Sequence, residues 1–249
     1  MSQSDNLQSV KNRTWFYEFD LPDGTRTKSD IPAEIGHIHR SRLDKLRKII
    51  SDNVPNASQQ TAVDFASHEG FYSIELAKHF SSVRGLEIRD ESMNAAKLML
   101  EVLNVKNVTY EKADLQKLEY DEKFSADFVL VYGLMYHLEN PIHTLRLASD
   151  LSRKHILIET QVFPYDILGK LEDGHYKSQR DMHGVFSLSV DYAKRREGGS
   201  TDIALVPSLN SLIFLMHNFG FKTVEVLKPD ADDYEQFQRG SRVVVYGRK

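Results

Sequence analysis

The sequence contains no cysteine among its 249 residues. Disulfide bonds, thiolate nucleophiles and cysteine-ligated metal centres are therefore excluded, and the composition favours a reducing compartment, so we expect a cytoplasmic protein. No apolar run approaches the ~18 residues needed to span a bilayer. The polar first residues, MSQSDNLQSVKNR, do not resemble a signal peptide, and we expect no association with a membrane.

An excess of basic residues is also missing. There are 36 acidic and 32 basic residues, which give a net charge of −4. A dedicated nucleic-acid binder usually carries a basic balance, so this composition argues against one. The one notable basic cluster runs from His37 to Lys48. It could hold a phosphate or a nucleic acid, but a solvated helix face is the simpler interpretation.

Several catalytic and nucleotide-binding motifs are absent. The sequence has no H-x-x-x-H or other dense spacing of metal ligands, and we predict no catalytic metal. A Ser-His-Asp triad stays possible, but no G-x-S-x-G elbow is present. No G-K-[ST] follows a glycine-rich loop, and only Gly70 represents the G-x-G-x-x-G fingerprint. A nicotinamide-dependent oxidoreductase is therefore poorly supported.

What the chain does have is a regular alternation of strand and helix patterns. We expect strands at 61–65, 83–88, 108–111, 127–132, 156–159, 223–227 and 242–246. Helical patterns separate them at 71–80, 91–103, 141–151 and 208–219. This order predicts an α/β fold with a Rossmann-like seven-stranded sheet, mostly parallel with an antiparallel C-terminal strand, and with helices on both faces.

Two regions lie outside this alternation. We expect residues 1–54 to form an N-terminal unit, a mobile polar start followed by a β-hairpin over 15–27 and a helix, that covers the cleft. Within it, Trp15 and Tyr17 could line a lid, although core packing is the simpler role. Residues 55–249 form the main domain, and the polar segment at about 160–207 is an insertion on its substrate side.

Three acidic residues follow successive strands. Asp64 lies in the first turn, VDFASHEGFYS; Glu87 closes the second strand; Asp114 follows the third. The carboxyl ends of parallel strands meet at one edge of a sheet, where α/β proteins bind ligands. A carboxylate at Glu87 can accept hydrogen bonds from ribose hydroxyls, and Asp114 can accept one from an adenine amino group. This set suits a cationic nucleoside better than a pyrophosphate.

The arrangement resembles the class I S-adenosylmethionine-dependent methyltransferases. Their first motif is usually D-x-G-x-G-x-G, whereas residues 64–70 here read DFASHEG. The chain is similar to a branch with A-x-x-E-G in that place and a strand-four motif like YGLMYHLENP at 132–141. That branch includes a wobble-uridine tRNA methyltransferase-like group and small-molecule methyltransferases. The resemblance implies S-adenosylmethionine as cofactor, S-adenosylhomocysteine as product, and a cofactor site at Asp64, Ala66, Ser67, His68, Gly70, Glu87, Ile88, Asp114, Leu115, Tyr132 and Gly133.

Two departures from the glycine-rich motif need an explanation. Ala66 is small enough for a cofactor to approach the backbone. His68 replaces a glycine, so we expect a negative φ there, since a bulky residue at positive φ is strained. Its imidazole would then lie near the amino-acid end of the cofactor, in reach of the carboxylate.

The pair of residues best suited to catalysis is Tyr136-His137, which directly follows a strand predicted to be buried. Histidine is the natural general base for a hydroxyl acceptor, although His137 could instead cap or support the next helix. Glu159 and His183 are further candidates for substrate contacts.

We expect methyl transfer to an oxygen, or a nitrogen, of a small-molecule acceptor. Modification of a tRNA base and a non-catalytic module that binds adenosyl ligands stay open as alternatives. The sequence leaves the oligomeric state open, and an exposed hairpin or the insertion could mediate a homodimer.

Overall fold

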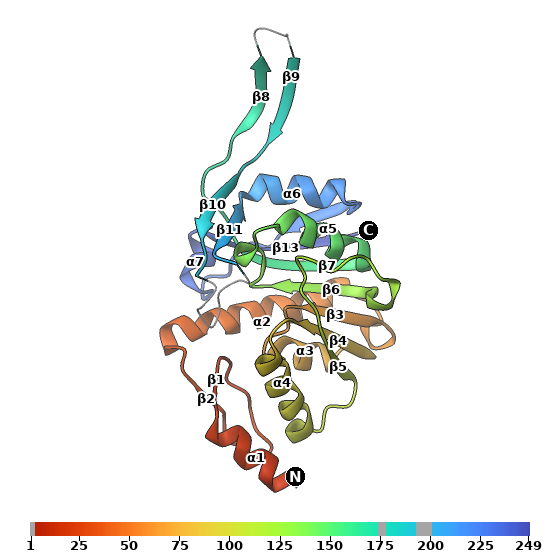
Figure 1. Cartoon of the computed structure of the whole chain (residues 1–249), viewed down its shortest axis with the longest axis vertical. Helices are drawn as coiled ribbons and strands as arrows, with labels where there is room; N and C mark the ends of the chain where they lie inside the picture. Colours follow the sequence, from red (N-terminus) through yellow and green to blue (C-terminus); the bar gives the residue numbers. More distant parts are fainter. Residues whose placement is uncertain (1–2, 174–177, 193–200) are drawn as a thin grey trace.

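The computed structural model describes residues 3–173, 178–192 and 201–249 (Figure 1). Its centre is a seven-stranded sheet in the order β12-β13-β7-β6-β3-β4-β5, within which only β13 runs antiparallel to its neighbours. The predicted fold class is therefore confirmed. The strands are β3 (Thr61–Phe65), β4 (Ser82–Glu87), β5 (Val108–Lys112), β6 (Ala126–Tyr132), β7 (Ser152–Gln161), β12 (Thr223–Val226) and β13 (Arg242–Arg248).

Helices cover both faces of the sheet. Strand β6 shows how the sequence achieves this, since successive side chains of a strand point to opposite faces. Phe128 and Leu130 pack into one apolar cluster, together with residues of α2 (Ala33–Asn53), α3 (Phe71–Ala77) and α4 (Asp90–Leu103). Val129 and Val131 pack into the other, with residues of α5 (Pro141–Leu151) and α6 (Leu209–Asn218). A strand buried on both faces explains the continuous apolar run FVLVY.

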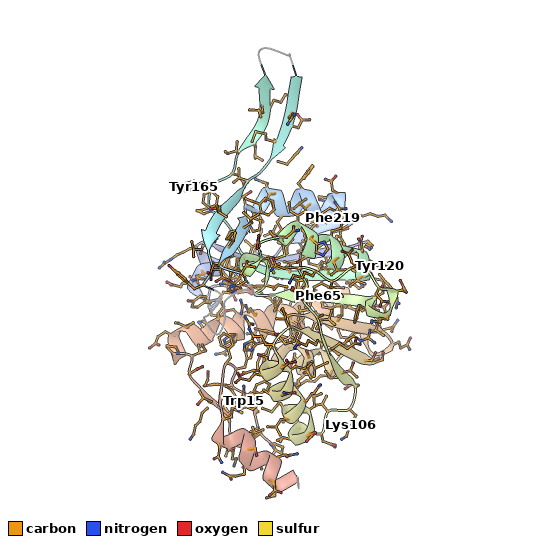
Figure 2. The ribbon with its side chains drawn as sticks, viewed as in Figure 1. Trp15, Phe65, Lys106, Tyr120, Tyr165 and Phe219 are labelled. Atoms are coloured by element: carbon orange, nitrogen blue, oxygen red, sulfur yellow. The ribbon has the colours of Figure 1, made fainter. Side chains whose placement is uncertain are left out.

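The N-terminal residues differ from the prediction. Residues 1–12 were expected to lack fixed structure, but α1 covers Gln3–Asn12. Its Asn6 amide donates a 2.7 Å hydrogen bond to Glu101 of α4, and Val10 is fully buried. Trp15 is fully buried as well and donates through Nε1 to the carbonyl of Val10, so it belongs to the core (Figure 2).

The predicted hairpin is only partly formed. Asp20 and Arg26 make a single antiparallel bridge, while β1 (Thr14–Trp15) pairs in parallel with β2 (Lys28–Ser29). The turn residues Pro22-Asp23-Gly24 form the bend, and the flanking segments stay in contact beyond the bridge, where the amide of Thr27 donates to the carbonyl of Phe19 and the amide of Asp30 to that of Trp15.

The insertion forms two antiparallel ribbons. β8 (Leu168–Asp173) and β9 (Ser178–His183) form an arm that projects from the body (Figure 1). β10 (Phe186–Val190) and β11 (Ile203–Pro207) form a second ribbon, which contacts the short helix η3 (Met135–His137). The remaining short helices are η1 (Ala57–Gln59), η2 (Glu122–Phe124) and α7 (Glu235–Gln238). Among the described helices, none is both long and apolar enough to cross a membrane.

Candidate active site

A cleft opens at the carboxyl ends of β3, β4, β5 and β6, with about 950 Å³ of space including its mouth. Ligand sites of α/β sheets lie at such an edge, where the strand order reverses, and here it reverses between β3 and β6. Ten predicted site residues line this cleft: Ala66, His68, Glu87, Ile88, Asp114, Leu115, Tyr132, Gly133, Tyr136 and His137. Parallel pairing thus brings together residues that lie between positions 66 and 137 of the sequence.

Glu87 is an acid of the cleft that two backbone hydrogen bonds hold in place. Its two carboxylate oxygens accept hydrogen bonds from the backbone amides of His68, at 2.9 Å, and Arg89, at 2.8 Å. Each oxygen has a second lone pair, so the carboxylate can still accept two hydroxyl donors. Asp114, from the loop after β5, accepts from the amide of Gln116 at 3.1 Å and lies in the cleft wall. The two acids therefore offer fixed acceptors at neighbouring strand ends.

The first loop corrects the expectation for His68. Its φ is +51°, and Ala66 has φ +56°, so both adopt the left-handed conformation that glycine would otherwise supply. The loop keeps the backbone shape of the glycine motif without its glycines, at a cost of about 1–2 kcal/mol per residue. The His68 ring packs edge-on against Phe16 and Tyr17. This packing with the N-terminal segment helps to hold the strained position.

Three residues predicted for the cofactor do not line the cleft. Asp64 lies within β3 rather than in the turn, is buried, and accepts a 2.6 Å hydrogen bond from Ser73. Burial raises the pKa of Asp64 to about 7. Ser67 is buried beside Gly85, and Gly70, at φ +83°, caps α3 where any Cβ would collide with Tyr110. These residues support the loop from behind.

His137 stands in the cleft wall at the end of η3. Its Nδ1 lies 2.8 Å from Oδ2 of Asp191, which follows β10 in the insertion. Burial, the larger effect, lowers the pKa of His137, while the Asp191 carboxylate opposes that shift. No described residue hydrogen-bonds its Nε2. The imidazole is therefore held through one nitrogen, is neutral near pH 7, and keeps the other nitrogen for a ligand.

Glu159 was predicted to contact substrate, but it lies beneath the cleft and is fully buried. It forms ion pairs of 2.6 Å with Arg42 of α2 and with Arg242 of β13, and it accepts from the amide of Gly133. Arg42 is 5% exposed and also lines the cleft. Because two arginines pair with one glutamate, a net positive charge is left at the floor of the cleft.

Tyr136 contacts Arg242, one of the two arginines that pair with Glu159. Its hydroxyl accepts a 3.3 Å hydrogen bond from Arg242, whose guanidinium also lies over the ring, 4.9 Å from the ring centroid. The ring of His137 lies 4.2 Å from that of Tyr136. The Glu159 ion pairs therefore support both aromatic residues of η3.

His183 was the other predicted substrate contact, and the structure places it elsewhere. It lies exposed on β9, and its ring stacks on Phe214 of α6 at 4.1 Å between centroids. It does not line the cleft. Among the described residues, no group of three or more histidines and acids could hold a metal ion.

Several cleft residues were missed by the sequence analysis: Phe16, Arg42, Leu86, Arg89, Ala113, Gln116, Leu134 and Leu138, together with Tyr17, for which core packing was favoured. The basic cluster at 37–48 held a signal for one of them. Arg42 and Lys45 are both buried, three residues apart on α2, and each has a buried acidic partner. Their spacing with Ile38, Leu46 and Ile49 places them on the apolar face, so the cluster is only partly a solvated face.

Comparison with known families identifies the central part of the chain. Residues 63–155 match the family model described as a methyltransferase domain. The match covers the first motif, both strand-end acids and the Tyr136-His137 pair. A comparison with curated proteins gives no match.

Solved structures share the fold over the whole chain. The N-terminal domain of EvdMO1, crystallised in the presence of SAH and D-fucose, is 23% identical with a TM-score of 0.72, covering 100% of this chain and 97% of that one. In the comparison with the crystal structure of EvdMO1, this chain spans 47% of the length of that chain.

A second relative is the magnesium protoporphyrin IX methyltransferase from Synechocystis PCC 6803 with bound SAH. It is 13% identical with a TM-score of 0.60, covering 99% of this chain and 94% of that one. The strand order, the first loop, the acids at the strand ends and the matched domain agree with one another. The central part of this chain thus matches a methyltransferase domain, and the chain as a whole shares the fold of these structures.

Proposed function

We propose that this protein transfers a methyl group from S-adenosylmethionine to an oxygen of a small hydroxylated acceptor, with His137 as general base. One observation carries the proposal: in the cleft wall, His137 is held by Asp191 at 2.8 Å and has Nε2 unbonded by any described residue. A neutral imidazole fixed through one nitrogen is suited to take a proton with the other.

The cleft residues fit the cofactor. Glu87 and Asp114 would accept hydrogen bonds from the ribose and the adenine, and Ile88 and Leu115 offer apolar surface beside them. The net positive charge at Arg42 would attract the carboxylate of the methionyl part. When bound, the cofactor supplies an electrophilic methyl group on a sulfonium.

Residues of this chain would accept and release the proton of the acceptor hydroxyl. Asp191 accepts a hydrogen bond from Nδ1–H, so Nε2 carries the lone pair. Nε2 would receive the proton of the acceptor hydroxyl as the acceptor oxygen bonds to the methyl carbon and the bond from that carbon to the cofactor sulfur breaks, which leaves S-adenosylhomocysteine. The imidazolium that results is stabilised by the Asp191 carboxylate, and it returns its proton to solvent after the product leaves. A base of this kind contributes about 10²–10⁴-fold, in addition to the effect of aligning the two reactants.

A sugar-like acceptor is favoured over a nucleic acid. The N-terminal domain of EvdMO1, similar over the full length of this chain, was crystallised in the presence of SAH and D-fucose. The net charge of −4 weighs against binding a polyanion such as tRNA. An oxygen acceptor is also the one that needs a base, because a hydroxyl must lose its proton during transfer.

An acceptor panel tests the proposal. Purified protein with S-adenosylmethionine is offered free and nucleotide-linked hexoses, amino sugars, phenols and unmodified tRNA, and products are identified by mass spectrometry. We expect methylation of a sugar hydroxyl. Methylation of an amine or of tRNA would overturn the choice of acceptor. Tight binding of S-adenosylhomocysteine without transfer to any compound would favour a non-catalytic binding module.

A further inference from the structure

The β10–β11 ribbon has its apolar face turned away from the body. Leu188 and Val190 on β10 share a face with their cross-strand partners Leu205 and Ile203. Leu188 is 71% exposed, Val190 66% and Ile203 45%. On the opposite face Ala204 is completely buried against the body. An apolar face toward solvent and a small residue toward the core is the reverse of the usual pattern of a half-buried sheet.

The edge of this ribbon is also unprotected. β10 pairs only with β11, so its other edge is open within the described part of the chain. Natural edge strands are usually guarded by charged residues, proline or bulges. β10 reads FSLSV and β11 reads IALVP, and neither carries a charge. A bare, apolar edge of this kind is expected to pair with another chain.

The surrounding insertion enlarges the apolar surface. Twelve large apolar side chains are exposed among the described residues, and eight of them lie between Tyr165 and Ile203. Figure 2 shows Tyr165 at the base of the arm. Leu188, Val190, Tyr192 and Ile203 lie on or beside the β10–β11 ribbon, and the other four lie on the arm and at its base. A specific interface buries about 800 Å² on each partner, and monomers rarely expose patches above a few hundred Å².

We infer that a second copy of this chain covers the β10–β11 face and forms a two-fold symmetric dimer. Two-fold symmetry places the same residues opposite each other, so a charged face would repel itself, whereas this uncharged pair of strands does not. An antiparallel edge can pair with its own copy without any further partner.

The dimer face is directly connected to the active site. Asp191 follows the last residue of β10, and its amide donates to the carbonyl of Asp202, the residue before β11. Leu205 of β11 donates to the carbonyl of Leu138, one residue after His137. A partner that fixes the ribbon would therefore also fix the group that holds the imidazole.

Multi-angle light scattering across a dilution series tests the inference. The wild-type chain is expected at twice the mass of one chain, and Leu188→Lys/Val190→Lys at the mass of one, because four lysines would meet across the axis. Ile35→Lys, the same kind of change at a 47% exposed residue of α2, is the matched control and should stay dimeric. A monomeric wild type would overturn the inference, and it is the result expected if another protein covers the face. A dimeric double variant would overturn it as well.

A cross-linking experiment covers the case in which the lysine variant misfolds. The chain has no cysteine, so Leu188→Cys carries a single thiol, and a bismaleimide should join two copies. Ile35→Cys should give none, and failure of Leu188→Cys to cross-link would overturn the inference. We also expect the lysine variant to lose kcat while keeping its affinity for S-adenosylhomocysteine. That second readout rests on the proposed function, whereas mass and cross-linking do not.

Discussion

Replacing Glu159 by glutamine should destabilise the protein strongly, although Glu159 does not line the cleft. The carboxylate is fully buried and neutralises two guanidiniums, each at 2.6 Å, which are themselves 5% and 4% exposed. Burial raises the pKa of Glu159, but the two arginines outweigh it, so the pKa is lowered overall and the group is charged. Glutamine keeps the shape and removes the charge, which leaves Arg42 and Arg242 buried without a counterion.

The magnitude follows from the burial. Removing one partner of a buried ion pair costs about 3–5 kcal/mol, because the remaining charge is poorly solvated. For a chain of this size, 1 kcal/mol shifts Tm by about 2–4 °C, so the expected loss is roughly 6–20 °C. Glu122→Gln is the matched control. Glu122 pairs with Arg153 at 3.1 Å on the surface, where solvent screens the pair, so its loss should leave Tm nearly unchanged.

Calorimetric unfolding of the two variants and the wild type at pH 7 measures the difference. The pH dependence is a second check. Because the folded pKa of Glu159 is lowered, its contribution is present above the ordinary range of glutamate and is lost as pH falls through the folded pKa. The gap between wild type and Glu159→Gln should therefore narrow in acid. A Tm within about 2 °C of wild type at pH 7 would refute the buried-cluster reasoning.

Three further predictions concern the loop and the cleft. Glu87→Ala should weaken binding of S-adenosylhomocysteine at least tenfold in a calorimetric titration, since it removes the proposed ribose acceptor and leaves two loop amides unpaired; unchanged affinity would rule out the proposed role of the acids at the strand ends. Asp64→Asn should gain stability relative to wild type as pH rises from 4 to 8, because a folded pKa raised to about 7 makes the wild type lose stability over that window; parallel stability curves would contradict it. Asp191→Asn should lower kcat at least tenfold with KM for the acceptor little changed, and it should move the acid limb of the rate profile to lower pH, since Asp191 raises the pKa of His137; a profile identical to wild type would assign Asp191 a structural role only.

The sheet could be predicted from the sequence because each strand carries its own signal. FVLVY is apolar at every position, as a strand covered on both faces requires, and the helix between 90 and 103 shows the expected spacing. Short-range patterns also predicted the acidic residues of the cleft, because the end of a strand determines where the next side chain lies. Glu87 and Asp114 needed only the parallel arrangement to be placed at one edge.

What the sequence could not show depends on distant partners. Arg42 and Glu159 are 117 positions apart, and a charge cluster on a helix looks solvated until its buried partner is known. Asp191 meets His137 only through the folded insertion. The φ of His68 followed the loop rather than the residue type, because the surrounding hydrogen bonds and aromatic packing outweigh a strain of about 1–2 kcal/mol.

The most direct test of the central claim is single-turnover transfer from S-adenosylmethionine to the acceptor found in the panel, comparing wild type with His137→Asn. The account predicts a rate lower by about 10²–10⁴-fold, with unchanged affinity for S-adenosylhomocysteine. It also predicts that the wild-type rate falls in acid as His137, whose pKa is lowered, takes up a proton. An unaltered transfer rate in His137→Asn, with the cofactor bound normally, would contradict base catalysis by His137.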